Sequence, residues 1–110
     1  MSGIVSVYAT FGTEEEARRV ARTCVEEGLA ACANILPAVH SIYRWKGEIE
    51  EAGEAAAIFK VAADRSAALI GRIAELHSYD VPAAVVWPIA GALESYSEWI
   101  ESESGSPEVK

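Results

Sequence analysis

The sequence contains little of what several functional classes require. Its 110 residues include two cysteines, too few for a disulfide-stabilised scaffold, and no apolar run approaches the roughly 20 residues that a membrane-spanning helix needs. The N-terminus shows no basic segment followed by an apolar stretch, so we expect no secretory signal. We therefore expect a cytoplasmic protein with reduced thiols, Cys24 and Cys32, and no membrane partner.

Basic residues are also scarce. Nine lysines and arginines stand against 17 aspartates and glutamates, which gives a formal net charge of -8 at pH 7. Because nucleic-acid binding depends mainly on basic side chains that neutralise phosphates, we expect no nucleic-acid partner. An acidic surface attracts cations, but it also keeps a protein in solution, and we favour the second explanation for this charge.

The short motifs of common catalytic and phosphate-binding sites are missing. None of G-x-x-x-x-G-K, G-x-S-x-G, H-E-x-x-H or C-x-x-C occurs in the sequence. Asp80 lies close to His77 in the chain, but nothing marks a nucleophile beside them. We therefore predict that the protein is not an enzyme and has no organic cofactor.

The residues that are present predict a single domain over residues 1–110. Hydrophobic residues make up 51% of the chain, enough for one core, and no linker or low-complexity segment divides it. Strand patterns occur at residues 4–10, about 32–50, 56–62 and 81–89, and helical patterns follow Thr13, Asp64 and Leu93. This β-α-β-β-α-β order with a final helix predicts an α+β, ferredoxin-like fold. The polar residues from about 103 to 110 are expected to form a flexible tail.

Local signals predict where several elements begin and end. Thr13 with Glu16 three residues later is a capping box, and Gly28 is expected to end that first helix. Asp64 is expected to cap the second helix, and residues 51–53 to form the turn of the hairpin. The buried face of the first helix is predicted to consist of one apolar stripe, Ala17, Val20, Ala21, Cys24 and Val25.

The most informative segment is residues 30–50, AACANILPAVHSIYRWKGEIE. Apolar or aromatic side chains alternate with polar ones over residues 41–46, as in a half-buried strand, with Tyr43 and Trp45 on one face. A strand of this length exceeds what a domain of 110 residues is expected to pair. Since an unpaired aromatic edge promotes association, the segment predicts an oligomer.

The same segment resembles a known family. The A-C-x-N-I motif around Cys32 and the S-I-Y-x-W-x-G-x-I motif from Ser41 are typical of the CutA family, the small divalent-cation tolerance proteins. The resemblance covers roughly residues 4–101 and continues in order through Phe59-Lys60-Val61, His77-x-Tyr79-x-Val81-Pro82 and Tyr96-x-x-Trp99-Ile100. It implies the ferredoxin-like fold, a homotrimer and the binding of divalent cations, copper before others.

The resemblance also implies metal ligands. Cys32 matches a cysteine that is a proposed copper ligand of the family, and His77 matches a histidine that could bind copper or zinc. Each has a structural alternative, because a free cysteine is often a small core residue and an imidazole at a helix end can interact with the helix dipole. Ser78 and Ala83 depart from the family motif, and Ala83 replaces a glutamate that could serve as a third ligand.

A second set of residues is predicted to line a ligand cleft or a subunit interface: Tyr43, Trp45, Lys60, Tyr79 and Trp99. Aromatic side chains are enriched at such interfaces. The CutA architecture also resembles that of the trimeric PII signalling proteins, which bind effectors between subunits. One alternative is therefore a regulatory module that binds a small anionic effector at Lys60, His77 and Tyr79. Another is a scaffold whose only activity is assembly.

Overall fold

The computed structural model describes residues 3–105 and confirms the predicted α+β, ferredoxin-like arrangement. The strands pair antiparallel in one sheet of order β2-β3-β1-β4. The strands are β1 (Ile4–Phe11), β2 (Cys32–Trp45), β3 (Glu48–Ala62) and β4 (Ala84–Pro88). The helices are α1 (Glu14–Glu26), α2 (Ser66–Leu76) and α3 (Glu94–Ser104), with a short 3-10 helix, η1 (Ala63–Arg65), before α2.

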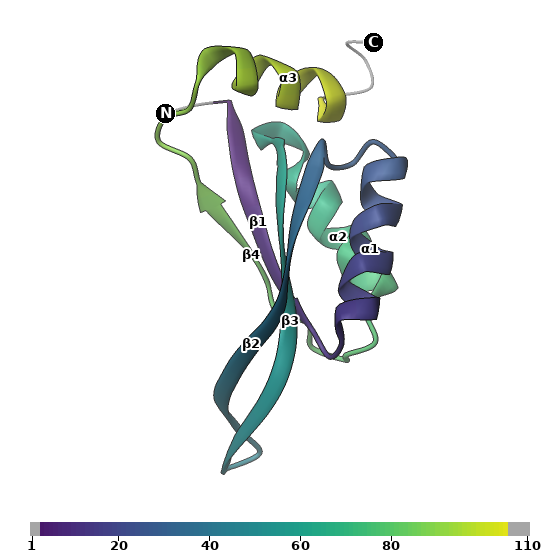
Figure 1. Cartoon of the computed structure of the whole chain (residues 1–110), viewed down its shortest axis with the longest axis vertical. Helices are drawn as coiled ribbons and strands as arrows, with labels where there is room; N and C mark the ends of the chain where they lie inside the picture. The colour runs from purple at the N-terminus through teal and green to yellow at the C-terminus, as the bar shows by residue number, and fades with distance from the viewer. Residues whose placement is uncertain (1–2, 106–110) are drawn as a thin grey trace.

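The helices α1 and α2 cover one face of the sheet, and α3 lies across one end of it (Figure 1). Between the sheet and the two covering helices lies the main core, which includes Val7, Phe11, Val20, Phe59 and Ile73. A smaller cluster around Ile4, Ala31 and Ile100 fixes α3. Within the described residues, every helix is too short or too polar to cross a membrane. Among the described helices, neither α1 nor α2 covers the opposite face of the sheet and α3 lies at its end, so we call that face the open face.

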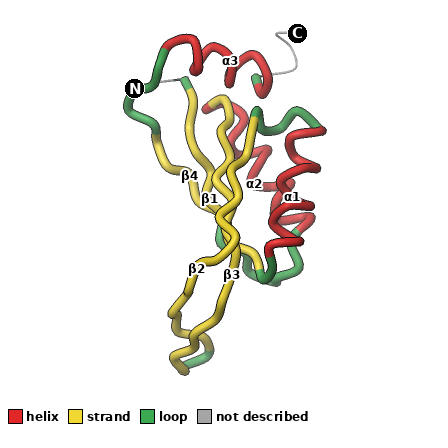
Figure 2. The backbone as a smooth tube through the Cα atoms, in the orientation of Figure 1, coloured by secondary structure: helices red, strands yellow, loops and turns green. Residues whose placement is uncertain are grey.

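The hairpin of β2 and β3 extends well beyond the rest of the sheet (Figure 2). β1 pairs with residues 55–62 of β3, whereas β2 and β3 remain paired as far as Trp45 and Glu48. A register shift between Leu36 and Val39 marks the point where the hairpin leaves the sheet. We call the projecting residues 39–54 the arm. The arm makes the molecule 46 Å long but only 25 and 22 Å across.

The turn of this hairpin is not where the sequence predicted it. It lies at Lys46 and Gly47, with φ of 51° and 84°, rather than at residues 51–53. Two positive φ angles are typical of a type I′ turn, and glycine adopts such an angle readily because it has no Cβ. The expectation that the long strand lacks a partner was also wrong, because β3 pairs with most of β2. β2 nevertheless remains an edge strand of the sheet.

Three other boundaries also differ from the prediction. Asp64 lies in η1, and the N-cap of α2 is Arg65, whose side chain makes no capping hydrogen bond. β4 begins at Ala84 rather than at residue 81, since Pro82 has no N–H for a ladder of hydrogen bonds. α3 extends to Ser104, which is buried and accepts a hydrogen bond from the Ala62 N–H at 2.9 Å. The predicted flexible tail therefore does not include residues 103–104, and residues 106–110 lie outside the described residues.

The signals for α1 are mostly confirmed. Thr13 Oγ1 accepts a hydrogen bond from the Glu16 N–H at 3.1 Å. The Glu16 carboxylate turns instead to the loop after α2, where it accepts from the Ser78 N–H at 2.8 Å and from its hydroxyl at 3.0 Å. The predicted stripe is buried except for Val25, which is 38% exposed, and Gly28 ends the helix with φ 75°. Local sequence signals therefore predicted this helix well.

Two glycines provide a matched test of backbone conformation. Gly28 has a positive φ and Gly71 lies inside α2, and an added Cβ would have no atom within 4 Å at either position. We expect Gly28→Ala to lower the free energy of unfolding by about 1 kcal/mol, because a Cβ disfavours this φ. Gly71→Ala should raise it by about 0.5–1 kcal/mol, because alanine loses less backbone entropy in a helix. Urea unfolding at one protein concentration measures both, and shifts of the same sign would contradict this explanation.

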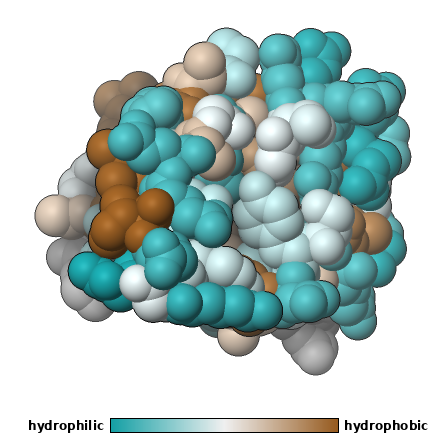
Figure 3. Space-filling view, turned by 90° about the horizontal axis from the view of Figure 1, so that it is seen from below, coloured by the Kyte–Doolittle hydropathy of each residue, from teal (hydrophilic) through white to brown (hydrophobic). Residues whose placement is uncertain are grey.

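Large apolar side chains remain on the surface of this chain. On the arm, Ile42 and Ile49 are 65% and 60% exposed and lie on the same face as Arg44, opposite the face of Tyr43. Seen from the end of the arm, the surface is mostly hydrophilic, with hydrophobic side chains between the polar ones (Figure 3). Isolated exposed apolar residues are common in proteins, but their concentration on a projecting ribbon is not.

Candidate functional site

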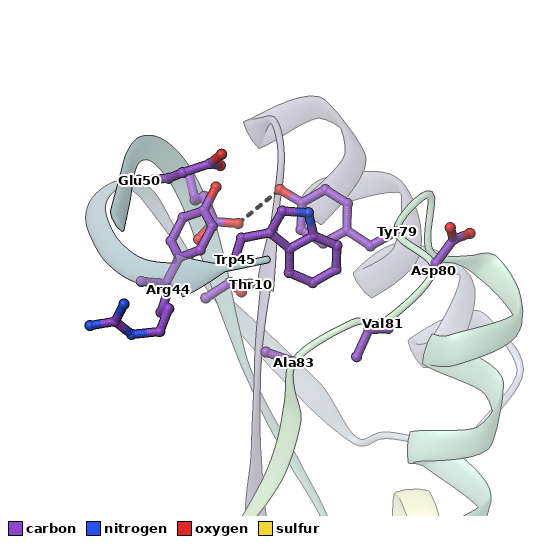
Figure 4. A pocket seen from close by; sticks show the side chains of 10 residues that line it. Thr10, Arg44, Trp45, Glu50, Tyr79, Asp80, Val81 and Ala83 are labelled. Carbon is purple, nitrogen blue, oxygen red and sulfur yellow. Dashed lines mark hydrogen bonds between the residues drawn. The ribbon is translucent and has the colours of Figure 1, made fainter. Parts of the chain in front are cut away.

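A pocket of about 500 Å³ lies where the arm leaves the sheet (Figure 4). Three separate parts of the chain form it: the arm, the end of β1 and the loop between α2 and β4. Its lining residues are Thr10, Tyr43, Arg44, Trp45, Glu50, Glu54, Tyr79, Asp80, Val81 and Ala83. The pocket therefore depends on how the arm is placed relative to the rest of the fold.

Glu54 connects the two sides of this pocket. Its Oε2 accepts a hydrogen bond from the Tyr79 hydroxyl at 2.8 Å, drawn in Figure 4, and its Oε1 accepts from the Ser41 hydroxyl at 2.6 Å. On the arm, Tyr43 pairs with Glu50 across the two strands, so that their side chains share the face turned to the pocket. The arm is thus joined to the loop by a carboxylate that has two hydroxyl donors.

The pocket has a negative electrostatic character. Glu50, Glu54 and Asp80 contribute three carboxylates, and Arg44 is the one basic residue in the described lining. Burial, followed by the hydrogen bond to the Glu54 carboxylate, raises the pKa of Tyr79 to about 12. Burial and then the Glu50 and Glu54 carboxylates also raise the pKa of Tyr43. Both phenols therefore keep their protons at neutral pH.

His77 follows α2 as its C-cap, and its side chain is buried. Nε2 lies 2.7 Å from the Thr10 carbonyl oxygen, and Nδ1 accepts a hydrogen bond from the Tyr79 N–H at 3.1 Å. Since a carbonyl only accepts, these contacts assign the proton to Nε2 and the lone pair to Nδ1. The ring also stacks on Phe11 with centroids 4.7 Å apart. Both nitrogens are thus used to hold the loop that carries Tyr79.

The two cysteines have different environments. Cys24 is fully buried on α1, and burial is the main cause that raises its pKa to about 11, so that it remains a neutral thiol. Cys32 begins β2, is half-buried, and places its Sγ 3.7 Å from the Tyr96 hydroxyl oxygen. In the sheet it pairs with Lys60 on the open face. Of the two thiols, only Cys32 is partly accessible in this chain.

The two predicted metal ligands do not meet within one chain. Through Lys60, Cys32 lies level with Ser6 of β1, whereas His77 contacts Thr10. Ser6 and Thr10 are four residues apart on β1, which corresponds to about 13 Å along the strand. Cys32 on β2 is also two strand spacings, about 10 Å, from β1 across the sheet. The side chains also lie on opposite faces, since His77 packs on Phe11 of the core. Among residues 3–105, no three His, Cys, Asp or Glu side chains are arranged to hold a metal ion.

The predicted cleft residues form two groups. Tyr43, Trp45 and Tyr79 line the pocket, whereas Lys60 lies beside Cys32 at the other end of the sheet. Trp99 is also at that end, in α3, with its ring 6.1 Å from that of Tyr96. In a single chain, the set Lys60, His77 and Tyr79 that an anionic effector was expected to contact does not line one cavity.

Sequence reasoning missed several lining residues of the pocket, chiefly Glu50, Glu54 and Asp80. One signal could have found the first two: they alternate along β3 and, with the turn at residues 46–47, face the same side as Tyr43. Ala83, the position where the family motif has glutamate, also lines the pocket. Within one chain, a glutamate there would therefore join the pocket and not the surroundings of Cys32.

Comparison with known proteins agrees with the fold and the motifs. The family described as CutA1 divalent ion tolerance protein matches residues 5–103. The divalent-cation tolerance protein CutA of Thermus thermophilus is 41% identical over 99 residues, 90% of this chain and 96% of that protein. The CutA of Pyrococcus horikoshii is 41% identical over 101 residues, 92% of this chain and 98% of that protein. The chloroplastic CutA of Arabidopsis thaliana is 33% identical, but the chain spans only 55% of its length.

Solved structures give the same result. The CutA1 of Thermus thermophilus has a TM-score of 0.89 at 40% identity, over 93% of this chain and 99% of that one. The CutA of Xylella fastidiosa has a TM-score of 0.90 at 34% identity, over 93% of this chain and 98% of that one. With the family match over nearly the whole described chain, these likenesses place the protein in the CutA family of divalent-cation tolerance proteins.

Proposed function

We propose that this protein binds a divalent cation, copper in preference to others, as a homotrimer, and that it catalyses no reaction. The family match supports the connection to divalent cations. The observation that carries the proposal is the position of Cys32, a half-buried thiol at the start of an edge strand. Thiolates are ligands that soft metals such as copper prefer.

One chain supplies only part of a copper site at Cys32. The Tyr96 hydroxyl and the Lys60 side chain are its neighbours, and neither is a usual soft-metal ligand. We therefore propose that a neighbouring copy of the chain completes the site, so that cation binding depends on assembly. His77 enters this site only if its hydrogen bonds to Thr10 and Tyr79 break.

The exposed apolar surface supports the homotrimer. The face of the arm opposite Tyr43, which we call the outer face, carries Ile42 and Ile49. Trp87, 45% exposed, stacks on Tyr8 of the open face with ring centroids 4.7 Å apart. Trp99 is 44% exposed in the single chain, as expected for a residue that becomes buried on assembly, whereas the exposed Trp45 lines the pocket. An exposed edge strand is a template for pairing with another chain, and exposed apolar patches mark interaction sites.

Copper titration of cysteine variants tests the proposal. Cys32→Ser should abolish most stoichiometric copper binding, whereas Cys24→Ala, which changes only the core thiol, should leave it nearly intact. Binding by the parent should weaken as the pH falls, because protons compete with the metal for a thiolate. Equilibrium dialysis of metal-free protein measures all three effects. Equal copper binding by Cys32→Ser and the parent would mean that Cys32 is not the ligand.

A further inference from the structure

We propose that the pocket at the base of the arm binds an organic cation, an alkylammonium or guanidinium group with a small apolar body. This site goes beyond the divalent-cation function and is separate from Cys32. Ala83 and Thr10 of the pocket lie at one end of β1, while Cys32 is level with Ser6 toward the other end. The two proposals can therefore fail independently.

Aromatic rings form much of the pocket. Trp45 and Tyr43 come from the arm and Tyr79 from the loop after α2, and each is between 39% and 46% exposed. In Figure 4 the Trp45 indole is directed toward Tyr79 and Val81. The face of an aromatic ring attracts a cation, most strongly for tryptophan. Val81 and Ala83 complete a lining that suits the apolar body of such a ligand.

The charges of the pocket favour a cation over an anion. Glu54 is oriented by hydroxyl donors from Ser41 and Tyr79, and Glu50 and Asp80 add two more carboxylates. Arg44, the basic residue of the described lining, points away from the cavity in Figure 4. Burial first, and then carboxylates that include Glu54, raise the pKa of Tyr43 and of Tyr79, so that both phenols stay neutral and add no charge. An anionic effector would therefore be repelled here.

The size and chemistry of the pocket indicate an organic ion rather than a bare metal ion. Its volume of about 500 Å³ lies within the range of small-molecule sites, about 300–1,000 Å³. Hard metal ions require several converging oxygen ligands, whereas three aromatic rings occupy much of this lining. Rings combined with a few carboxylates are the arrangement that recognises ammonium groups.

The test is a titration with tetramethylammonium chloride, followed by tryptophan fluorescence. Sodium chloride controls for ionic strength, and tert-butanol serves as a neutral compound of similar size. We expect a saturable change with tetramethylammonium and none with tert-butanol at equal concentration. Ethylguanidinium, titrated in parallel, shows which kind of cation binds better. No saturable response to either cation, or an equal response to tert-butanol, would overturn the proposal.

Charge variants make the test sharper. Glu50→Gln, at an exposed position outside the Glu54 hydrogen bonds, should weaken tetramethylammonium binding about fivefold, and Trp45→Leu at least as much. Arg44→Gln removes a positive charge, the sign of the proposed ligand, and should therefore tighten tetramethylammonium binding. The same change would weaken the binding of an anion. Glu26→Gln removes an exposed carboxylate of α1 outside the pocket and should leave the affinity unchanged. Weaker binding by Arg44→Gln would contradict the assigned charge of the ligand.

Discussion

If the chain assembles as the proposed homotrimer, replacing Ile42 and Ile49 together by aspartate is expected to convert it into a monomer. The two side chains lie on the outer face of the arm and are 65% and 60% exposed in the single chain. If assembly covers them, each aspartate becomes an unpaired charge in an interface, which costs about 3–5 kcal/mol when nothing compensates it. Light scattering at micromolar protein concentration should then give the mass of one chain instead of three.

A matched control separates this effect from general damage. Val25→Asp introduces the same charge on α1, at a position that is 38% exposed on the helical layer, and it should leave the trimer mass unchanged. Circular dichroism should show that the double variant remains folded, because the arm contributes little to the main core. A double variant that keeps the mass of the parent would exclude the outer face of the arm from the interface. A monomeric parent would contradict the trimer itself.

The parts of the fold that depend on neighbouring residues could be predicted from the sequence. Thr13 and Gly28 mark the ends of α1 through backbone chemistry that operates within a few residues. The hairpin turn could not be located in this way. Apolar and polar residues alternate on both sides of Gly47, and residues 51–53 also contain a glycine. The strand period therefore does not distinguish the two positions of the turn.

Because the turn was predicted at the wrong residues, the pocket could not be predicted either. With the turn at residues 46–47, Glu50 lies opposite Tyr43 and Trp45 opposite Glu48, so that aromatic and acidic side chains share one face. With a turn at residues 51–53, the same glutamates would look like a solvated charge run at the end of a strand. Asp80 and Val81 complete the pocket from a loop whose position depends on the whole fold. Pairing between distant segments was the missing information.

The lack of pairing information also explains why Cys32 and His77 were predicted to be ligands of one metal ion. The family motifs placed Cys32 and His77 together as candidates, but strand register decides which residues meet, and a sequence without its pairing partners leaves that register open. Lys60 brings Cys32 level with Ser6, while Thr10 holds His77 on the other face. The two residues can join one site only if several chains bring them together and the hydrogen bonds of His77 open.

His77→Ala is expected to lower the free energy of unfolding by about 3 kcal/mol. The change removes a buried ring stacked on Phe11 and leaves the Thr10 carbonyl and the Tyr79 N–H without their partner. His40→Ala is the matched control, because its side chain is 65% exposed and contacts Glu51 on the surface of the arm. We expect that change to shift stability by less than about 0.5 kcal/mol. Urea denaturation at a fixed protein concentration measures both.

The same pair of variants distinguishes a structural histidine from a metal ligand. If His77 only holds the loop, copper should raise the melting temperature of His77→Ala by as much as that of the parent, since a ligand stabilises the state it binds. Loss of this copper-dependent rise in His77→Ala alone would make His77 a ligand. The hydrogen bonds of its two nitrogens to Thr10 and Tyr79 would then have to open when the metal binds. Because Tyr79 lines the pocket, such an opening would also couple cation binding at the metal site to the shape of the pocket.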